Sequence, residues 1–386
     1  MSVEDLHAVW AERSEDVPSD LWTQTFAPPH EGQWLYRALE RSGLEDQFRF
    51  RYLVLRQGDR DVGLAPTFVM DVPLRLVAPP SMQRVLEIVG RFIPSLLFQR
   101  TLFVGSPCSE AGHVGLVPGI DAVTALTCVD DALRRELRAS RASLRVWKDF
   151  DVQESVALAA MAQASGLFPV VSFPGTAVEL SSRSKEGYLG SLRKKQRHLF
   201  KKKLRRSRAL VDLEVEVVQS PGDDTLDALF ALFLQTYEKS KTKFERLNRR
   251  FFELVSQEES TRFIILRADG KPVAFMLCFE CAGQLINKFI GIDYRRPREW
   301  LLYFRLWDAA LDLALSSGAT RIQSGQTGYG PKFDLGHRLL PLTNFVAHPN
   351  PLLHRLFALV AQRVDWNTLD AALSAILVAH PEVAVA

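Results

Sequence analysis

Two segments of the sequence combine residue types that suit a bound phosphate or a ligand held close to the backbone. The first spans residues 292–298, between an apolar β-branched run and a long amphipathic pattern. Pro297 suits the first turn of a helix, and the N–H groups at a helix N-terminus attract anions. Arginines there add charge-assisted hydrogen bonds to phosphate. The predicted phosphate-binding residues are Arg295, Arg296 and Arg298. The competing interpretation is a solvated turn with three exposed arginines.

The second segment spans residues 325–336, in which four of the twelve residues are glycine. Glycine has no Cβ, so its backbone can approach a ligand closely. We expect Gln326 and Gly328 to contact a ligand, and Tyr329 and Lys332 to point into the same site. The alternative is a surface loop whose glycines serve only its turns.

A third segment concentrates positive charge. Residues 183–208 contain twelve Lys or Arg and one acid, although the whole chain carries only +3. The apolar residues between 188 and 210 fall on one helical stripe, which predicts a basic amphipathic helix. Its surface from Arg193 to Arg208 suits a tRNA backbone, an acidic carrier protein or an anionic membrane surface. The alternative is a solvated helix that crosses between domains.

Length and composition exclude several classes of protein. The 386 residues are 47% hydrophobic and 24% charged, which is typical of a globular chain and not of a disordered or collagen-like one. No run of about 18 uncharged apolar residues predicts a membrane-spanning helix. The first five residues are acidic and lack the apolar core of a signal peptide, and the chain has only four Cys. We therefore expect a cytoplasmic location.

The spacing of cysteine and histidine predicts no metal site. Cys278 and Cys281 have CxxC spacing, but three residues apart on a strand their side chains face opposite ways. No second pair has metal-ligand spacing, and none of the eight His forms a His-x-x-x-His pair with an acid. We interpret both thiols as core residues.

The elements that must position these segments alternate between strands and helices. In the first half, residues 48–56 and 62–70 predict a hairpin, and residues 81–99, 129–143 and 152–165 predict helices. In the second half, the predicted strands are residues 213–219, 261–267, 272–281, 284–292, 320–324 and 339–347. The predicted helices there are residues 226–239, 246–257, 298–317 and 351–364. Three strands joined by short turns form an antiparallel meander, and a helix-linked strand then pairs in parallel.

This order, together with three patches, resembles the GNAT acyltransferase superfamily and in particular its FemAB-like branch. The patches are residues 188–197 (YLGSLRKKQR), 270–274 (GKPVA) with 288–293 (KFIGID), and 325–332 (GQTGYGPK) with Gly336. The resemblance implies an α/β (α+β) fold with two tandem GNAT-like mixed β-sheet domains and flanking helices. We expect an N-terminal domain at 1–180, an acyltransferase domain at 181–350, and C-terminal helices at 351–386.

The activity that this resemblance implies is N-acyl transfer directly to an amine, without a covalent intermediate. The amine must lose a proton, the carbonyl oxygen becomes an oxyanion, and the leaving group is protonated. The implied catalytic residues are Tyr329 as the acid, Lys332 as the stabiliser of an oxyanion or phosphate, and Asp293 as the base. Glu238, His337 and a chain of water molecules are alternatives for the base.

The resemblance leaves the acyl donor open. GNAT proteins typically carry a glycine-rich pyrophosphate loop before the long helix, whereas residues 293–300 contain no glycine. Acyl-CoA, acyl carrier protein and aminoacyl-tRNA are therefore all possible co-substrates, and no permanently bound cofactor is expected. The alternative function is a non-catalytic protein that binds RNA or a membrane surface on a transferase fold.

Overall fold

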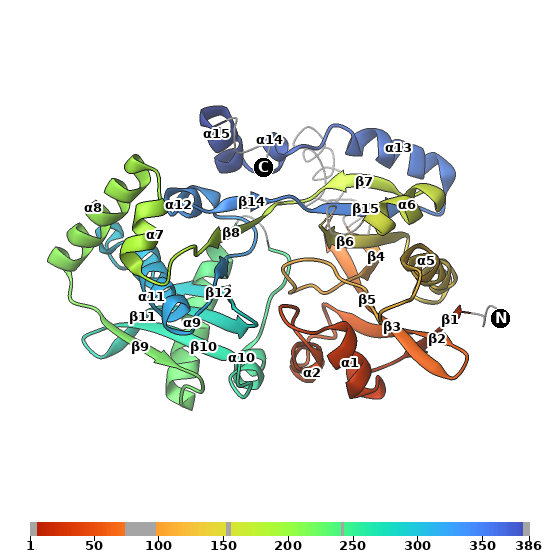
Figure 1. Cartoon of the computed structure of the whole chain (residues 1–386), viewed down its shortest axis with the longest axis horizontal. Coiled ribbons are helices and arrows are strands. Elements are labelled where there is room, and N and C mark those ends of the chain that lie inside the picture. The colour runs from red at the N-terminus through yellow and green to blue at the C-terminus, as the bar shows by residue number, and fades with distance from the viewer. Residues whose placement is uncertain (1–5, 74–97, 152–155, 241–242, 381–386) are drawn as a thin grey trace, which may run out of the picture. The chain divides into compact units, whose positions relative to one another are not determined.

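The computed structural model describes residues 6–73, 98–151, 156–240 and 243–380, which form two compact units (Figure 1). The first unit is built mainly from Glu31–Pro174 and Pro341–Ser374, and the second mainly from Gly175–Leu340. The helix predicted at residues 81–99 lies outside the described residues, apart from its last two positions.

The first unit contains one sheet with the strand order β1-β2-β3-β4-β6-β15-β7, and β5 pairs with β3. Its strands are β1 (Leu6–Ala11), β2 (Arg49–Gln57), β3 (Arg60–Pro73), β4 (Phe98–Val104), β5 (Gly115–Leu116), β6 (Leu144–Phe150), β7 (Phe168–Val171) and β15 (Thr343–Ala347). Its helices are α1 (Ser19–Thr25), α2 (Gln33–Arg41), α5 (Ala122–Ala139), α6 (Val156–Ala164), α13 (Pro351–Ala361) and α14 (Trp366–Leu369), followed by α15 (Ala371–Ala379). The predicted hairpin is confirmed as β2 and β3.

Helix α5 shows why this unit has a core. The Asp121 side chain caps the helix by accepting a hydrogen bond from the Thr124 N–H, which satisfies one of the free donors of the first turn. Ala125, Val129 and Leu133 follow at intervals of four residues and are fully buried. This apolar stripe faces the core, as helical periodicity requires.

The second unit contains a seven-stranded sheet with the order β14-β8-β13-β12-β11-β10-β9. Its strands are β8 (Gly175–Glu179), β9 (Glu214–Val218), β10 (Thr261–Ala268), β11 (Lys271–Cys281), β12 (Gln284–Ile292), β13 (Arg321–Gln323) and β14 (Arg338–Leu340). Its helices are α7 (Lys185–Ser191), α8 (Lys194–Leu210), α9 (Asp223–Lys239), α10 (Arg249–Val255), α11 (Leu302–Ser316) and α12 (Tyr329–Asp334), with a 3-10 turn at Arg298–Trp300. The predicted meander β10-β11-β12 and the parallel pairing of β12 with β13 are confirmed.

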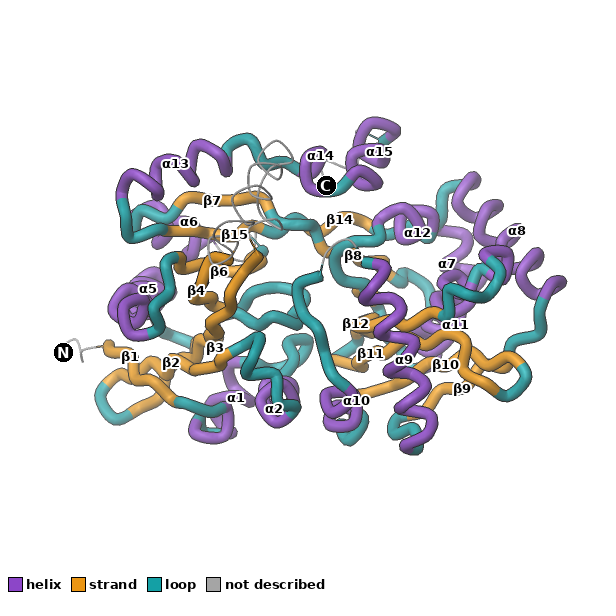
Figure 2. The backbone as a smooth tube through the Cα atoms, turned by 180° about the vertical axis from the view of Figure 1, so that it is seen from behind, coloured by secondary structure: helices purple, strands orange, loops and turns teal. Residues whose placement is uncertain are grey.

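Helices cover both faces of this second sheet (Figure 2). On one face, Trp307 of α11 packs with Tyr188 of α7 and Phe200 of α8, with ring centroids 5.3 and 5.7 Å apart. On the other face, Phe252 of α10 packs on Phe275 of β11 at 6.0 Å. Successive side chains of a strand point to opposite faces, so β11 contributes to both apolar layers.

The two sheets divide the chain differently from the expected boundaries at residues 180 and 350. Strand β8 comes before residue 180 but lies between β13 and β14 in the second sheet, whereas β15 lies between β6 and β7 in the first. The strand predicted at 339–347 is broken into β14 and β15, which belong to different sheets. Pro341 explains the break, since it has no N–H to donate to a ladder.

The single basic helix predicted at 188–210 is two helices, α7 and α8. Leu192 and Arg193 separate them with extended backbone, at ψ 147° and 144°. The long helix predicted from residue 298 also begins later, because Leu301 takes a left-handed conformation (φ 51°) between the 3-10 turn and α11.

Candidate active site

The second sheet opens between β12 and β13. Their parallel ladder has only three register pairs and ends at Ile286 opposite Gln323. Strand β12 continues to Ile292, which adds six residues, or roughly 20 Å at the rise of a strand. We call the place where the two strands stop pairing, together with the edge of residues 287–292 beside it, the wedge. In open α/β sheets, ligands bind beyond the carboxyl ends of parallel strands.

Buried polar side chains form a hydrogen-bonded chain at the vertex of this wedge. Asn287 and Ser324 occupy the register positions directly after the last backbone pair, and Asn287 Nδ2 donates to Ser324 Oγ at 3.1 Å. Ser324 Oγ lies 3.0 Å from His337 Nε2, and Cys278 Sγ lies 3.3 Å from Asn287 Oδ1. All four residues are less than 9% exposed. We call these four residues the vertex chain.

The vertex chain has one consistent direction of donation. His337 Nδ1 lies 2.9 Å from the carbonyl oxygen of Lys332, so Nδ1 carries the proton and Nε2 accepts from the Ser324 hydroxyl. Ser324 is then free to accept from Asn287, whose amide oxygen accepts from the Cys278 thiol. Burial, reinforced by the positive charge of Lys332, lowers the pKa of His337 to about 3. A neutral, buried imidazole of this kind holds other groups in place and is a poor general base.

The backbone of helix α9 packs closely against that of β12 beside the wedge. A Cβ on Gly291 would lie 2.7 Å from the backbone of both Leu232 and Phe233, and 2.3 Å from Phe275 Cε1. Only glycine allows so close an approach of two backbones. The Thr236 hydroxyl, one turn further along α9, accepts a hydrogen bond from the Ile292 N–H at 3.0 Å. The position of α9 is thus fixed against the extended part of β12.

Asp293 follows β12 and is held by its neighbours. Its carboxylate accepts hydrogen bonds from Arg295 Nε at 2.7 Å and from Arg296 Nε at 3.3 Å. The hydrogen bond from Arg295 is the main reason that the pKa of Asp293 is lowered. Asp293 is buried and Arg298 is exposed. A carboxylate with a lowered pKa accepts a proton weakly, so the geometry favours a positioning role for Asp293 over that of a base.

The glycine-rich loop begins at the vertex and is anchored from both sides. The Gly325 carbonyl accepts from Thr176 Oγ1 of β8 at 2.8 Å and from Lys332 Nζ at 3.1 Å. Lys332 Nζ also donates to the Gln326 carbonyl at 3.0 Å. Gly328 takes a left-handed conformation with φ 62° before α12. The loop is therefore held by the lysine that the sequence singles out.

Helix α12 carries the remaining predicted residues. Tyr329, its first residue, is 1% exposed, and Lys332 is 7% exposed. Helix α8 holds α12 in place: Gln196 Nε2 donates to the Phe333 carbonyl at 2.7 Å, and Lys203 Nζ pairs with Asp334 at 2.7 Å. The basic helix thus has a structural role on the side that faces α12.

The structure arranges the predicted residues in two groups, one on each side of the wedge. Residues 293–298 follow the end of β12, and residues 325–332 follow β13. Sequence analysis did not single out Asn287 or Ser324. The available signal was the amide of Asn287 directly after the apolar pair Leu285 and Ile286, because a buried amide needs hydrogen-bond partners. Glu238, one alternative base, is exposed and pairs with Lys243 at 3.2 Å.

The parallel ladder of the first unit also ends before one of its strands does. Its parallel pair, β4 and β6, keeps its register to Val104, which is the last residue of β4. Strand β6 continues for three residues beyond Trp147, to Phe150. The strand that runs past the ladder is thus β6 in the first unit and β12 in the second, where the part beyond the ladder is six residues long.

Two searches of the described residues gave negative results. Within residues 6–73, 98–151, 156–240 and 243–380, no helix is long and apolar enough to cross a membrane. Across the same ranges, no group of three or more His, Cys, Asp and Glu side chains is placed to hold a metal ion.

Comparison with known proteins identifies the fold. Residues 194–322 match the family model of the acetyltransferase (GNAT) domain. The chain is similar to the crystal structure of FemX, with 12% identity, 91% of this chain and 100% of that chain covered, and a TM-score of 0.59. None of the curated proteins compared with the chain matches it.

Two further solved structures are similar over most of the chain. A tandem GNAT protein from the clavulanic acid biosynthesis pathway has 12% identity, covers 90% of this chain and 99% of its own, and gives a TM-score of 0.52. A conserved protein of unknown function from Bacteroides thetaiotaomicron has 12% identity, with coverages of 85% and 94% and a TM-score of 0.50. The family match supports the predicted class of acyltransferase. The chain therefore has the tandem GNAT fold of the FemAB-like branch, as the sequence predicted.

Proposed function

We propose that the protein transfers an acyl or aminoacyl group from a phosphate-bearing carrier to an amine, and that the wedge between β12 and β13 admits the activated acyl group. The observation that carries the proposal is the early end of the parallel ladder at Ile286 and Gln323, beyond which β12 continues alone. An extended acyl carrier arm suits a strand edge that continues after its ladder with the neighbouring strand has ended. The match of residues 194–322 to the GNAT domain supports the same chemistry.

The reaction is a direct exchange at the acyl carbon. The amine nitrogen attacks the carbonyl, the C–N bond forms, and the C–S or C–O bond to the carrier breaks. The proton lost by the amine ends on the sulfur or oxygen of the leaving group, so no covalent enzyme intermediate is needed. The register between β11 and β12 shifts by one residue next to Asn287. Such bulges redirect backbone groups, and redirected N–H groups beside the wedge are suitable donors to an oxyanion.

The predicted residues divide between carrier binding and loop positioning. Arg295, Arg296 and Arg298 follow β12 directly, where they can bind the phosphates of the carrier. Asp293 fixes the first two of these arginines. Lys332 holds the loop that contains Gln326 and Gly328, and the acid role of Tyr329 remains part of the proposal.

The proposal is tested with a panel of donors. Purified protein is offered acyl-CoA, acyl carrier protein and aminoacyl-tRNA donors with amine acceptors, and the products are measured by mass spectrometry. We expect the arginine-substituted variant R295A/R298A to raise the KM for acyl-CoA, and not that for the corresponding acyl-pantetheine, which lacks the nucleotide and its phosphates. Arg250→Ala, at an exposed position on α10, is the control.

One outcome would contradict the proposal. If no donor in the panel is consumed and Lys332→Met has no effect on any reaction, the transferase assignment fails. The alternative, a non-catalytic protein that binds RNA or a membrane surface, would then be favoured. One observation supports that alternative: the exposed face of α8 carries Lys194, Lys195 and Lys202, for which the described residues provide no ion pair.

A further inference from the structure

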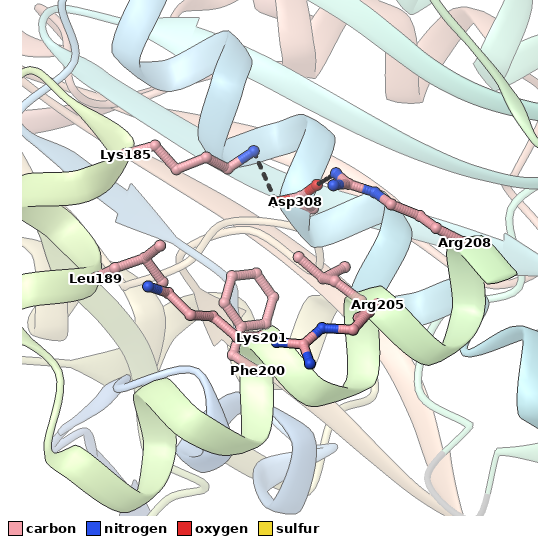
Figure 3. Close-up of a pocket in the computed structure, with 8 residues that line it drawn as sticks. Lys185, Leu189, Phe200, Lys201, Arg205, Arg208 and Asp308 are labelled. Carbon is pink, nitrogen blue, oxygen red and sulfur yellow. Dashed lines mark hydrogen bonds and ion pairs between the residues drawn. The ribbon is translucent and has the colours of Figure 1, made fainter.

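A pocket formed by α7, α8 and α11 lies in the second unit. It has a volume of about 390 Å³, which is within the range of small-ligand pockets. Figure 3 shows its lining side chains. Phe200 and Leu204 form an apolar floor together with Leu189. None of these residues takes part in the wedge.

The charges around this pocket do not balance. Asp308 is the one acid in its lining, and it is 5% exposed. Its two carboxylate oxygens are already engaged, by Lys185 Nζ at 2.7 Å and by Arg208 at 2.9 Å (Figure 3). Lys201 and Arg205 also line the pocket, and no anionic side chain among the described residues pairs with either. The pocket lining therefore holds four cations and one acid, and although Lys185 also pairs with Asp312 at 2.8 Å, Lys201 and Arg205 are left without an ion pair in the part of the chain that the structure describes.

A third arginine strengthens the positive potential behind the pocket. Arg305 of α11 is 8% exposed and donates to Ser207 Oγ at 3.3 Å. Burial, followed by repulsion from Arg208, lowers the pKa of Arg305. An anion bound near Arg208 would relieve this repulsion. Cations that remain uncompensated in a concave site are suited to a compact anion that brings several acceptor oxygens.

We propose that the pocket between α7, α8 and α11 binds a phosphate ester, with its phosphate between Lys201, Arg205 and Arg208. The phosphate oxygens accept hydrogen bonds from the two unpaired cations, Lys201 and Arg205. They also accept from the donors of Arg208 that Asp308 does not use. The carbon portion of the ester lies over Leu189. A soluble phosphate ester and the headgroup of an anionic phospholipid share this chemistry. The proposal does not depend on acyl transfer, because binding is measured without any donor.

The helix provides a matched pair of variants for the test. Lys201 and Arg205 line the pocket, whereas Lys202 and Arg206 do not. Both pairs consist of one Lys and one Arg four residues apart, and all four residues are exposed. The variants K201A/R205A and K202A/R206A therefore remove the same charge from the same helix, with little effect on folding expected from either.

Binding of sn-glycerol 3-phosphate is measured by titration calorimetry, with thermal unfolding to confirm that each variant is folded. We expect K201A/R205A to weaken binding by at least about tenfold, and K202A/R206A by less than about twofold. Asp308→Asn should act in the opposite direction and tighten binding severalfold, because it frees Arg208 and leaves Lys185 paired with Asp312 alone. The full chain is also floated with phosphatidylcholine vesicles with and without phosphatidic acid.

Each outcome decides the proposal. Loss of glycerol phosphate binding in K201A/R205A but not in K202A/R206A supports a soluble ester. If only the flotation with phosphatidic acid vesicles is lost selectively in K201A/R205A, the result supports the lipid headgroup. Equal losses in the two variants would overturn the proposal in favour of nonspecific attraction to the helix. Absence of binding to both glycerol phosphate and the vesicles would overturn the proposal. A duplex RNA is titrated in the same way. If it binds the protein more tightly than either probe, and both variants weaken RNA binding equally, the proposal is also overturned.

Discussion

Asn287 and Ser324 are bonded through their side chains at the first position where β12 and β13 no longer pair through their backbones. The hydrogen bond of 3.1 Å takes the place of the next backbone pair, and it joins both strands to His337. A sheet that opens here needs a defined vertex, because buried polar groups without partners cost free energy. In the vertex chain, each of these buried polar side chains has a neutral hydrogen-bond partner.

Replacement of Asn287 by alanine should weaken both the fold and the wedge. The change leaves the Ser324 hydroxyl and the Cys278 thiol without their amide partner, at a cost of about 1–3 kcal/mol in the free energy of unfolding. We expect acyl transfer to fall by more than tenfold, because the position of β13 relative to β12 is no longer fixed. Urea unfolding and single-turnover assays measure the two effects.

Cys278→Ala is the control for that variant. It removes only the terminal donor of the vertex chain, and a thiol is a weak donor. We therefore expect transfer close to that of the unaltered protein. Wild-type activity in Asn287→Ala would show that the vertex chain does not position the site.

Gly291→Ala should displace α9 from β12. Its Cβ would lie 2.3 Å from Phe275 Cε1 and 2.7 Å from the α9 backbone, and overpacking of this kind costs about 1–3 kcal/mol. We expect a lower midpoint of urea unfolding together with weaker binding of the acyl donor. Gly190→Ala on α7 is the control, since a Cβ there meets no atom within 4 Å and the residue lies outside the wedge. An equal effect of both substitutions would contradict this account.

Acid should destabilise the second unit through His337. The folded state holds its pKa near 3, whereas in an unfolded chain it is about 6.5. The unfolded state therefore binds the proton first, so this contribution to stability is complete above about pH 6.5 and is lost as the pH falls towards 3. The loss by pH 4.5 is up to about 3 kcal/mol. His337→Gln should show a shallower dependence of unfolding free energy on pH between 6.5 and 4.5, and an unchanged slope would refute this assignment.

Asp293→Asn should affect carrier binding more than proton transfer. The lowered pKa keeps the carboxylate ionised throughout the neutral range, so its removal should leave the pH profile of kcat unchanged. It should raise the KM for acyl-CoA, because Arg295 and Arg296 lose the group that holds them. A large fall in kcat with an altered acidic limb would instead restore Asp293 as the general base.

Much of the second unit was predictable from its sequence. The turn at residues 268–271 has the Asp-Gly signal, and it is followed by alternating apolar strands whose register the buried face fixes. The meander β10-β11-β12 and the parallel β13 follow from these local patterns. Residues 293–298 and 325–332 could likewise be placed at strand ends, because they directly follow two apolar runs.

The vertex chain and the exchange of strands were harder to predict. Asn287 and Ser324 are 37 residues apart, and their contact depends on where the ladder ends, which no local pattern specifies. Strands β8 and β14 have five and three residues, too few for their periodicity to show which sheet they join. The break between α7 and α8 was hidden because the apolar stripe continues across Leu192 and Arg193.

The exchange of β8 and β15 has a consequence for biosynthesis. The first sheet places β15 between β6 and β7, so among the described strands β7 has no neighbour until residue 347 has left the ribosome. A fragment that starts at residue 181 would likewise lack the strand between β13 and β14. Neither half of the polypeptide can complete its sheet alone, and maturation of both therefore becomes a late event that is shared by the whole chain.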